Sequence, residues 1–227
     1  MKKSHGQDGT DRDYRYADQS NYCEGSMDSQ AVQKYLTLMG EIKRRTTVAA
    51  ALANGMVHVV YKATTIESIY LQYRKMLELI ALGSLVANKE VFSEVYQDFA
   101  KYWNAEFLLK DIERVNPDFY PRPIIQKPSR VPGKTEWSDR PNDYLTKDEL
   151  IKLYKKCGAI MHSGNPYGSQ VDYAYYETMV AHWGTRITNL LDAHYIRLVN
   201  DPNLYLIQMG SNEEAPNYTP FAPLDKK

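Results

Sequence analysis

The sequence predicts an all-α fold, a helical bundle of about four long helices that carries a small β-hairpin near its C-terminus. Three observations indicate this fold. Apolar residues recur at the spacing of amphipathic helices over most of the chain. The helical stretches end at stop signals such as Asn54-Gly55 and Asn116-Pro117. Near the C-terminus, two short apolar segments within residues 194–209 have the composition of paired strands.

The first helix is expected to run from Asp28 to the Asn54-Gly55 stop, because Val32, Tyr35 and Met39 begin a helical repeat. The segment that follows, MVHVVY at 56–61, is β-branched and too short for a helix, so a short strand or an extended link is predicted. Residues 1–27 are polar and lack apolar periodicity. They are interpreted as a flexible N-terminal arm.

The second helix, TTIESIYLQYRKMLELIALGSLVANKE, is apolar on almost every side and is therefore expected to be buried nearly all round. Arg74 and Glu78 lie four residues apart within it. An unpaired buried charge costs several kcal/mol. Arg74 and Glu78 are therefore predicted to form a buried structural charge pair rather than an active site.

A third helix is expected from about Lys89 to Val115, ahead of a proline-rich insertion at 117–144. This insertion holds six prolines and is far longer than an ordinary loop. It also carries basic side chains that are candidates for contact with RNA or a partner protein, namely Arg122, Lys127, Arg130 and Lys134. The simpler alternative is a solvated loop, because basic residues on loops usually face water.

The next helix begins at a capping box formed by Thr146 and Glu149 and ends before Ser163-Gly164-Asn165-Pro166. Lys155 precedes His162 by seven residues, which places the two about 20° apart on one helix face. This face turns away from the apolar stripe that includes Leu153 and Cys157. Lys155 and His162 are therefore candidates for catalysis, although His162 could equally serve as a cation at the end of its helix.

Another long helix is expected from Ser169 to about Asp192. A small hairpin at 194–209 follows, with its turn at Asp201-Pro202. Residues 211–227 contain three prolines and no periodicity, and are interpreted as a flexible tail. The expected organisation is a single helical domain over 28–210, with the insertion and the hairpin as parts of it.

Composition excludes several classes of function. Lysine plus arginine equals aspartate plus glutamate at 28 each, so contact with nucleic acid would need a local basic patch. Two cysteines and scattered histidines give no metal-ligand spacing, so neither a metal nor another cofactor is expected. No apolar run is long enough to span a membrane, and the N-terminus has no apolar segment typical of a secretion signal. A cytoplasmic protein is expected.

The segments IESIYLQYRKMLELIALGSLVAN and ELIKLYKKCGAIMHSGNPY resemble the HEPN superfamily, whose helical bundles carry an Arg-x(4–6)-His motif late in the domain. The resemblance covers roughly residues 28–193. It implies a homodimer and, as in many members, a metal-independent ribonuclease of a toxin–antitoxin or other antiviral system. Lys155 takes the arginine position and His162 the histidine position. In active members these residues from both subunits meet at the dimer interface and cleave RNA with its own 2′-hydroxyl.

Two functions remain open. The first is a HEPN-like ribonuclease or RNA-binding effector of prokaryotic defence, with RNA and an antitoxin or other protein as partners. The second is a non-catalytic dimeric helical module that binds a protein partner or a small ligand. Lys155 is the residue that separates these two functions. Active members have arginine at this position, whereas lysine meets phosphate as a point charge and lacks the two-pronged geometry of arginine.

Overall fold

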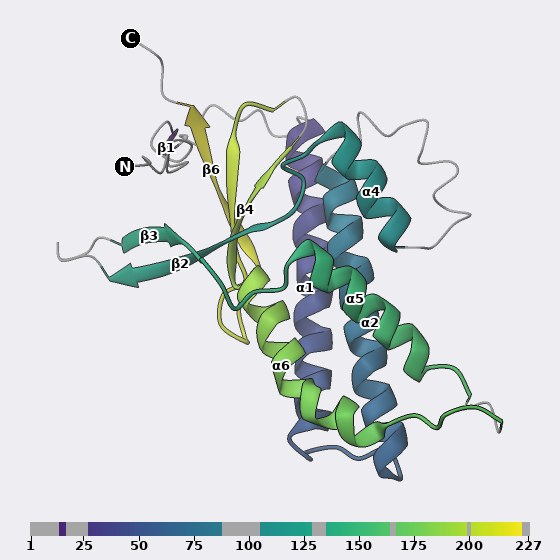
Figure 1. The fold of residues 1–227 in the computed structure, drawn as a ribbon. Helices are drawn as coiled ribbons and strands as arrows, with labels where there is room; N and C mark the ends of the chain where they lie inside the picture. The colour runs from purple at the N-terminus through teal and green to yellow at the C-terminus, as the bar shows by residue number, and fades with distance from the viewer. Residues whose placement is uncertain are drawn as a thin grey trace, which may run out of the picture.

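A computed structural model describes residues 14–16, 27–87, 105–128, 135–163, 167–198 and 201–223. Within these ranges the chain forms five helices and one antiparallel sheet of six strands. The prediction of an all-α bundle with one small hairpin is therefore wrong, and the fold is mixed α/β. Figure 1 shows the sheet on one side of the two longest helices, near one of their ends.

The helices are α1 (Met27–Ala53), α2 (Lys62–Ala87), α4 (Ala105–Val115), α5 (Lys147–Ile160) and α6 (Tyr173–Leu191). All five begin or end close to the positions expected from the sequence. Of the expected third helix only the part from Ala105 onward is described, and the part from Lys89 to residue 104 lies outside the described residues. Residues 56–61 form bends in an irregular link between α1 and α2, without a strand.

The helical core is built around α1 and α2, which lie side by side in Figure 1. Their contact is close because Gly83 of α2 faces Tyr35 of α1. A methyl group at Gly83 would come within 2.9 Å of the Tyr35 ring, so a larger residue would push the two helices apart. The helices α5 and α6 pack on α2 with buried residues that include Leu153, Cys157 and Ile187.

The strands are β1 (Tyr14–Tyr16), β2 (Arg122–Pro128), β3 (Thr135–Asp139), β4 (Ala193–Arg197), β5 (Leu204–Gln208) and β6 (Asn217–Pro223). Their order in the sheet is β1-β6-β5-β4-β2-β3, and every neighbouring pair is antiparallel. The pair β4–β5, with His194 opposite Ile207, is the hairpin that the sequence predicts. It is the centre of a larger sheet rather than an isolated appendage.

The other four strands lie in segments that the sequence analysis assigns to loops or flexible ends. Both β2 and β3 fall in the proline-rich insertion at 117–144, β6 falls in the tail at 211–227, and β1 falls in the arm at 1–27. Proline lacks the backbone N–H that a central strand needs. The strand β2 pairs with β4 only at Arg122 and Pro123, so the rest of β2 is paired on one side, by β3.

A buried hydrogen-bond relay joins the sheet to α1. The Tyr35 hydroxyl donates to Nε2 of His194 in β4 over 2.8 Å, and Nδ1 of His194 donates to the Leu191 carbonyl over 2.9 Å. Both side chains are buried. Burial lowers the pKa of His194 to about 4, because the charged imidazolium would lose its hydration, although the hydrogen bond to Leu191 acts in the opposite direction. His194 is therefore neutral at pH 7 and bonds both neighbours.

None of the helices in the described part of the chain combines the length and apolarity that a bilayer span requires.

The buried histidine predicts how stability depends on pH. In the unfolded chain a histidine has a pKa near 6.5, whereas folded His194 takes up a proton only near pH 4. Since the unfolded state binds the proton first, its population rises as the pH falls. His194 alone should reduce the free energy of unfolding by about 3 kcal/mol between pH 7 and pH 4. Urea titrations at several pH values would measure this loss.

The matched comparison uses two histidine variants. His194→Gln removes the titrating group and should flatten the pH dependence between pH 6.5 and 4, although the variant is less stable at pH 7. His182→Gln changes an exposed histidine of α6 and should keep the slope of the unmodified protein. Equal slopes in all three proteins would mean that His194 is not the group that resists protonation.

Candidate functional site

Lys155 and His162 are both exposed, at the C-terminal end of α5 and just beyond it. The helix ends at Ile160, earlier than the sequence spacing implies. The backbone N–H groups of Met161 and His162 donate to carbonyls three residues back, which tightens the last turn and ends the α-helix. His162 therefore does not lie in the last turn of α5, and the expected 20° offset from Lys155 on one helix does not hold.

The neighbouring Lys156 ties α5 to α6. Its ammonium group lies 4.6 Å from the centre of the Tyr175 ring and donates to the Tyr175 hydroxyl over 2.9 Å. The next tyrosine, Tyr176, donates from its hydroxyl to the Lys156 carbonyl over 3.3 Å. The C-terminal end of α5 and the N-terminal end of α6 are thus held together.

We use the name α5–α6 basic surface for five exposed or partly exposed residues at this end of the two helices and in the segment that joins them, namely Lys155, Lys156, His162, Tyr167 and Tyr175. It combines cations with aromatic rings that face water, since Tyr167 is 97% exposed and Tyr175 is 39% exposed. Cations can hold phosphates and exposed rings can stack on unpaired bases. This is a local patch of the kind that a chain with no net charge needs in order to contact nucleic acid.

Arg74 and Glu78 lie together, as the sequence indicates, but they are not fully buried. Their charged groups approach to 3.3 Å, and 26% of the Arg74 side chain and 19% of the Glu78 side chain remain exposed. Arg74 also lies 4.2 Å above the Tyr154 ring and donates to its hydroxyl over 2.7 Å. Gly158 makes room for this guanidinium, because a methyl group there would lie 3.1 Å from Arg74 Nη1. Arg74 therefore joins α2 to α5.

The basic residues of the insertion are not gathered at the α5–α6 basic surface. Arg122 lies 3.5 Å from Asp139 and 5.2 Å above the centre of the Tyr195 ring, within the sheet. Lys127 is exposed near the end of β2. Figure 1 shows β2 and the C-terminal end of α5 on opposite sides of the molecule. Arg130 and Lys134 lie outside the described residues.

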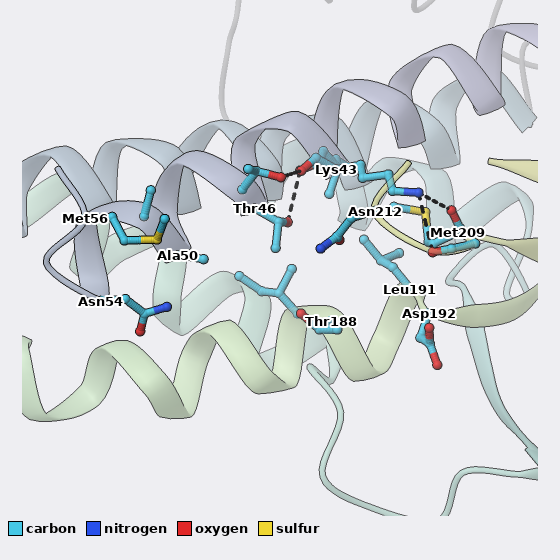
Figure 2. A pocket seen from close by; sticks show the side chains of 15 residues that line it. Lys43, Thr46, Ala50, Asn54, Met56, Thr188, Leu191, Asp192, Met209 and Asn212 are labelled. Atoms are coloured by element: carbon cyan, nitrogen blue, oxygen red, sulfur yellow. Dashed lines mark hydrogen bonds between the residues drawn. The ribbon is translucent and has the colours of Figure 1, made fainter. Parts of the chain in front are cut away.

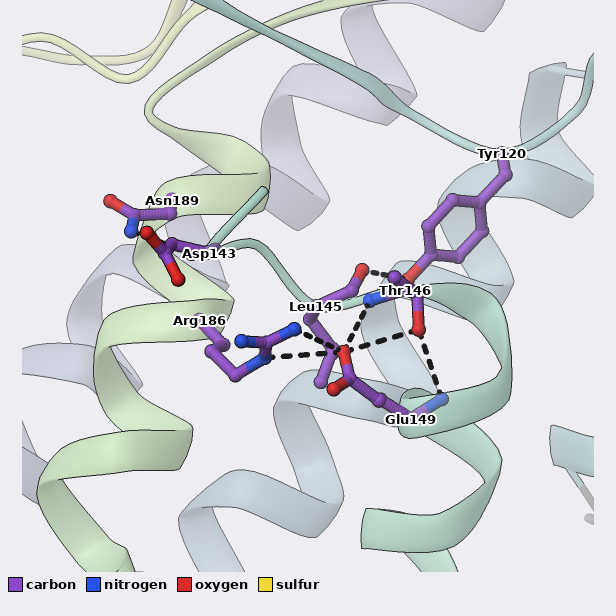
Figure 3. Close-up of polar contacts among 7 residues, drawn as sticks. All are labelled: Tyr120, Asp143, Leu145, Thr146, Glu149, Arg186 and Asn189. Atoms are coloured by element: carbon purple, nitrogen blue, oxygen red, sulfur yellow. Dashed lines mark hydrogen bonds and ion pairs between the residues drawn. The ribbon is translucent and has the colours of Figure 1, made fainter. Parts of the chain in front are cut away.

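The start of α5 is fixed by a single carboxylate oxygen (Figure 3). Oε2 of Glu149 accepts hydrogen bonds from the backbone N–H of Thr146 over 3.0 Å and from the Thr146 hydroxyl over 3.1 Å. It also accepts two from Arg186 of α6, over 3.1 and 2.8 Å. The predicted capping box is thus present and is extended by an ion pair. Partial burial opposes ionisation of Glu149, but the hydrogen bonds from Thr146 and Arg186 outweigh it and lower its pKa.

A cavity of about 370 Å³ between α1 and α6 is the feature that sequence reasoning missed (Figure 2). Its floor is formed by the buried side chains of Ile42, Ile187 and Leu191. Its walls carry the small side chains of Thr46, Ala50 and Thr188. Periodicity in the sequence shows which residues face inward, but it does not show that two helices leave a space between them.

One end of this cavity is closed by the connection between β5 and β6, which Lys43 of α1 holds in place. The Lys43 ammonium group donates to the carbonyls of Met209 over 2.7 Å and Glu214 over 2.6 Å, and also to that of Ser211. The connection is also closed on itself, because Glu214 accepts from the Ser211 N–H over 2.8 Å. No periodicity could have revealed this contact, since it joins residues more than 160 positions apart.

The Glu149 contacts predict a measurable loss of stability. Glu149→Ala removes both the capping interaction and the acceptor for Arg186, and should reduce the free energy of unfolding by about 2 kcal/mol at pH 7. The control is Glu113→Ala, which breaks the more exposed pair with Lys147 and should cost about 0.5 kcal/mol or less. Chemical denaturation measures both values.

The effect of Glu149→Ala should also depend on pH. Because the folded pKa of Glu149 is lowered, its contribution is complete above the unfolded value of about 4.3 and is lost as the pH falls through the folded value. The difference between the two proteins should therefore shrink below pH 4. A constant difference down to pH 2 would show that the ionised carboxylate is not the stabilising form.

Comparison of the chain with protein families, with curated proteins and with solved structures finds no match. The HEPN resemblance thus rests on the two quoted segments. The first segment falls on α2, and the second falls on α5 and the residues that follow it. Arg74 joins these two helices.

Proposed function

We propose that this chain is a HEPN-like RNA-binding effector that cleaves RNA without a metal at the α5–α6 basic surface. One observation carries the proposal. Lys155 and His162 are both exposed near the junction of α5 and α6, where Lys156 contacts the Tyr175 ring and Tyr167 in the joining segment is exposed. A cation, a proton-transfer group and stacking rings are the parts that such chemistry needs.

In this proposal His162 accepts the proton of a ribose 2′-hydroxyl, and Lys155 holds the neighbouring phosphate. The 2′-oxygen forms a bond to phosphorus while the bond from phosphorus to the 5′-oxygen breaks, and the leaving 5′-oxygen takes up a proton. One product then ends in a 2′,3′-cyclic phosphate and the other begins with a 5′-hydroxyl. All the atoms of the reaction come from the RNA, apart from the transferred protons.

The resemblance further supports a homodimer that acts in a prokaryotic defence or toxin–antitoxin system in the cytoplasm. Symmetric dimers are the commonest homo-oligomers. A second subunit would bring a second Lys155 and a second His162 to the same RNA if the α5–α6 basic surface lies at the dimer interface. An antitoxin would act by covering this surface.

The cavity between α1 and α6 favours a second candidate function, a non-catalytic module that binds a small ligand. It is a concave, largely apolar space of the size that small-molecule sites have. RNA cleavage separates the two functions, because it requires His162, whereas the ligand-binding module does not.

The decisive variant is His162→Ala. It should abolish cleavage of single-stranded RNA in the presence of a chelator, since no other group at this surface is proposed to take the 2′-hydroxyl proton. The melting temperature should stay unchanged, because His162 is exposed and lies beyond the end of α5. Gel analysis of end-labelled RNA would measure cleavage and identify the cyclic phosphate. His182→Ala, which alters an exposed histidine elsewhere on α6, is the matched control and should cleave normally.

Lys155→Arg tests the proposal that the side chain at this position holds the phosphate. A guanidinium meets phosphate with two parallel hydrogen bonds, so this variant should cleave RNA about tenfold faster than the unmodified protein. If neither the unmodified protein nor Lys155→Arg cleaves RNA at concentrations that support dimers, the nuclease proposal is wrong and the ligand-binding module remains.

A further inference from the structure

Among the polar side chains that line the cavity between α1 and α6, Asn212 lies on the connection that Lys43 holds in place. Asn212 lies in the connection from β5 to β6, and Figure 2 shows its carboxamide between Leu191 and Thr46, directed into the cavity. No hydrogen bond joins this carboxamide to another of the described residues. It can therefore both donate to and accept from a molecule in the cavity.

The connection that carries Asn212 is held on both sides of this residue. The Lys43 ammonium group binds the carbonyls of Met209 and Ser211, which precede Asn212 in the chain. It also binds the carbonyl of Glu214, which follows Asn212. Gly210 in this connection has a positive φ of 67°, a conformation that glycine adopts without strain. A polar group that is fixed before a ligand arrives costs less conformational entropy on binding. These contacts hold the backbone on either side of Asn212, whose exposed side chain lies where the cavity meets the β5–β6 connection.

We propose that this cavity binds a neutral, largely apolar small molecule that places one hydrogen-bonding group against the Asn212 carboxamide. The apolar part of the molecule would lie on Ile42, Ile187 and Leu191. The small side chains of Ala50 and Thr188 leave it room between the two helices.

The charged side chains around the cavity favour a neutral ligand over an ion. Two ionisable side chains line the cavity, Lys43 and Asp192. The donors of Lys43 are engaged by backbone carbonyls. Figure 2 shows the Asp192 carboxylate directed away from the other labelled side chains. An ion bound over the apolar floor would lose hydration without a partner, which costs several kcal/mol.

The size of the space selects a molecule of roughly 15 to 20 non-hydrogen atoms, at the small end of the range for ligand sites. A second cavity of about 490 Å³ shares Thr46, Ala50 and Thr188 with the first and extends along α6 to Glu177, beside Tyr73 of α2. An elongated molecule can therefore extend along the helices, with its polar end at Asn212.

The test uses the neutral fluorophore prodan, a naphthalene that carries a carbonyl group and emits at shorter wavelength when it leaves water. The unmodified protein should bind it saturably with a stoichiometry of one per chain. Ala50→Trp fills the space and should weaken binding at least tenfold. Asn212→Ala removes the donor to the carbonyl and should weaken binding about fivefold. Val48→Trp is the control, because Val48 is 47% exposed on α1 but does not line the cavity.

Circular dichroism would establish that each variant is folded, and Asn212→Ala keeps the test valid if Ala50→Trp does not fold. Absence of saturable binding to the unmodified protein would overturn the proposal. Equal affinity of all four proteins would also overturn it, because the probe would then bind elsewhere. If the affinity falls as the protein concentration rises, a second copy of the chain occupies the cavity instead.

Discussion

The candidate surface depends on the placement of α5, and the Glu149 carboxylate fixes its N-terminal end. Oε2 of Glu149 receives the capping hydrogen bonds of Thr146 and the guanidinium of Arg186 (Figure 3), so it fixes both where α5 begins and how it lies against α6. At the other end of α5, Lys156 binds Tyr175 of the same helix α6. With both ends attached, the helix sets the position of Lys155, and the tightened turn after Ile160 sets that of His162.

A similar attachment joins the sheet and the cavity to α1. Tyr35 binds His194 of β4, and Lys43, two turns further along the helix, binds the connection between β5 and β6. Hydrophobic packing has no preferred direction, so packing alone would let the sheet shift along α1. These polar contacts fix its position. The helix α1 thus sets the position of the sheet and, through Lys43, the position of Asn212.

The sequence predicted local features well and contacts between distant segments poorly. Helix periodicity and the Thr146–Glu149 capping box were sufficient for α5, because both depend on residues within one or two turns. The strands β2 and β6 were missed because each contains two prolines and pairs with partners far along the chain. His162 was identified by its spacing from Lys155, but the tightened turn that ends α5 at Ile160 moved it off the helix. Lys43 and Asn212 show no signal, because their roles arise only when α1 meets the β5–β6 connection.

The central claim is that RNA binds at the α5–α6 basic surface, and photochemical crosslinking tests it most directly. Single-stranded RNA that contains thiouridine would be irradiated with the protein, and the crosslinked peptides identified by mass spectrometry. The account predicts crosslinks at Tyr167 and Tyr175, the two rings that face water beside the lysines. Crosslinks confined to the sheet around Lys127, or an absence of crosslinks at RNA concentrations that saturate other single-strand binders, would contradict it.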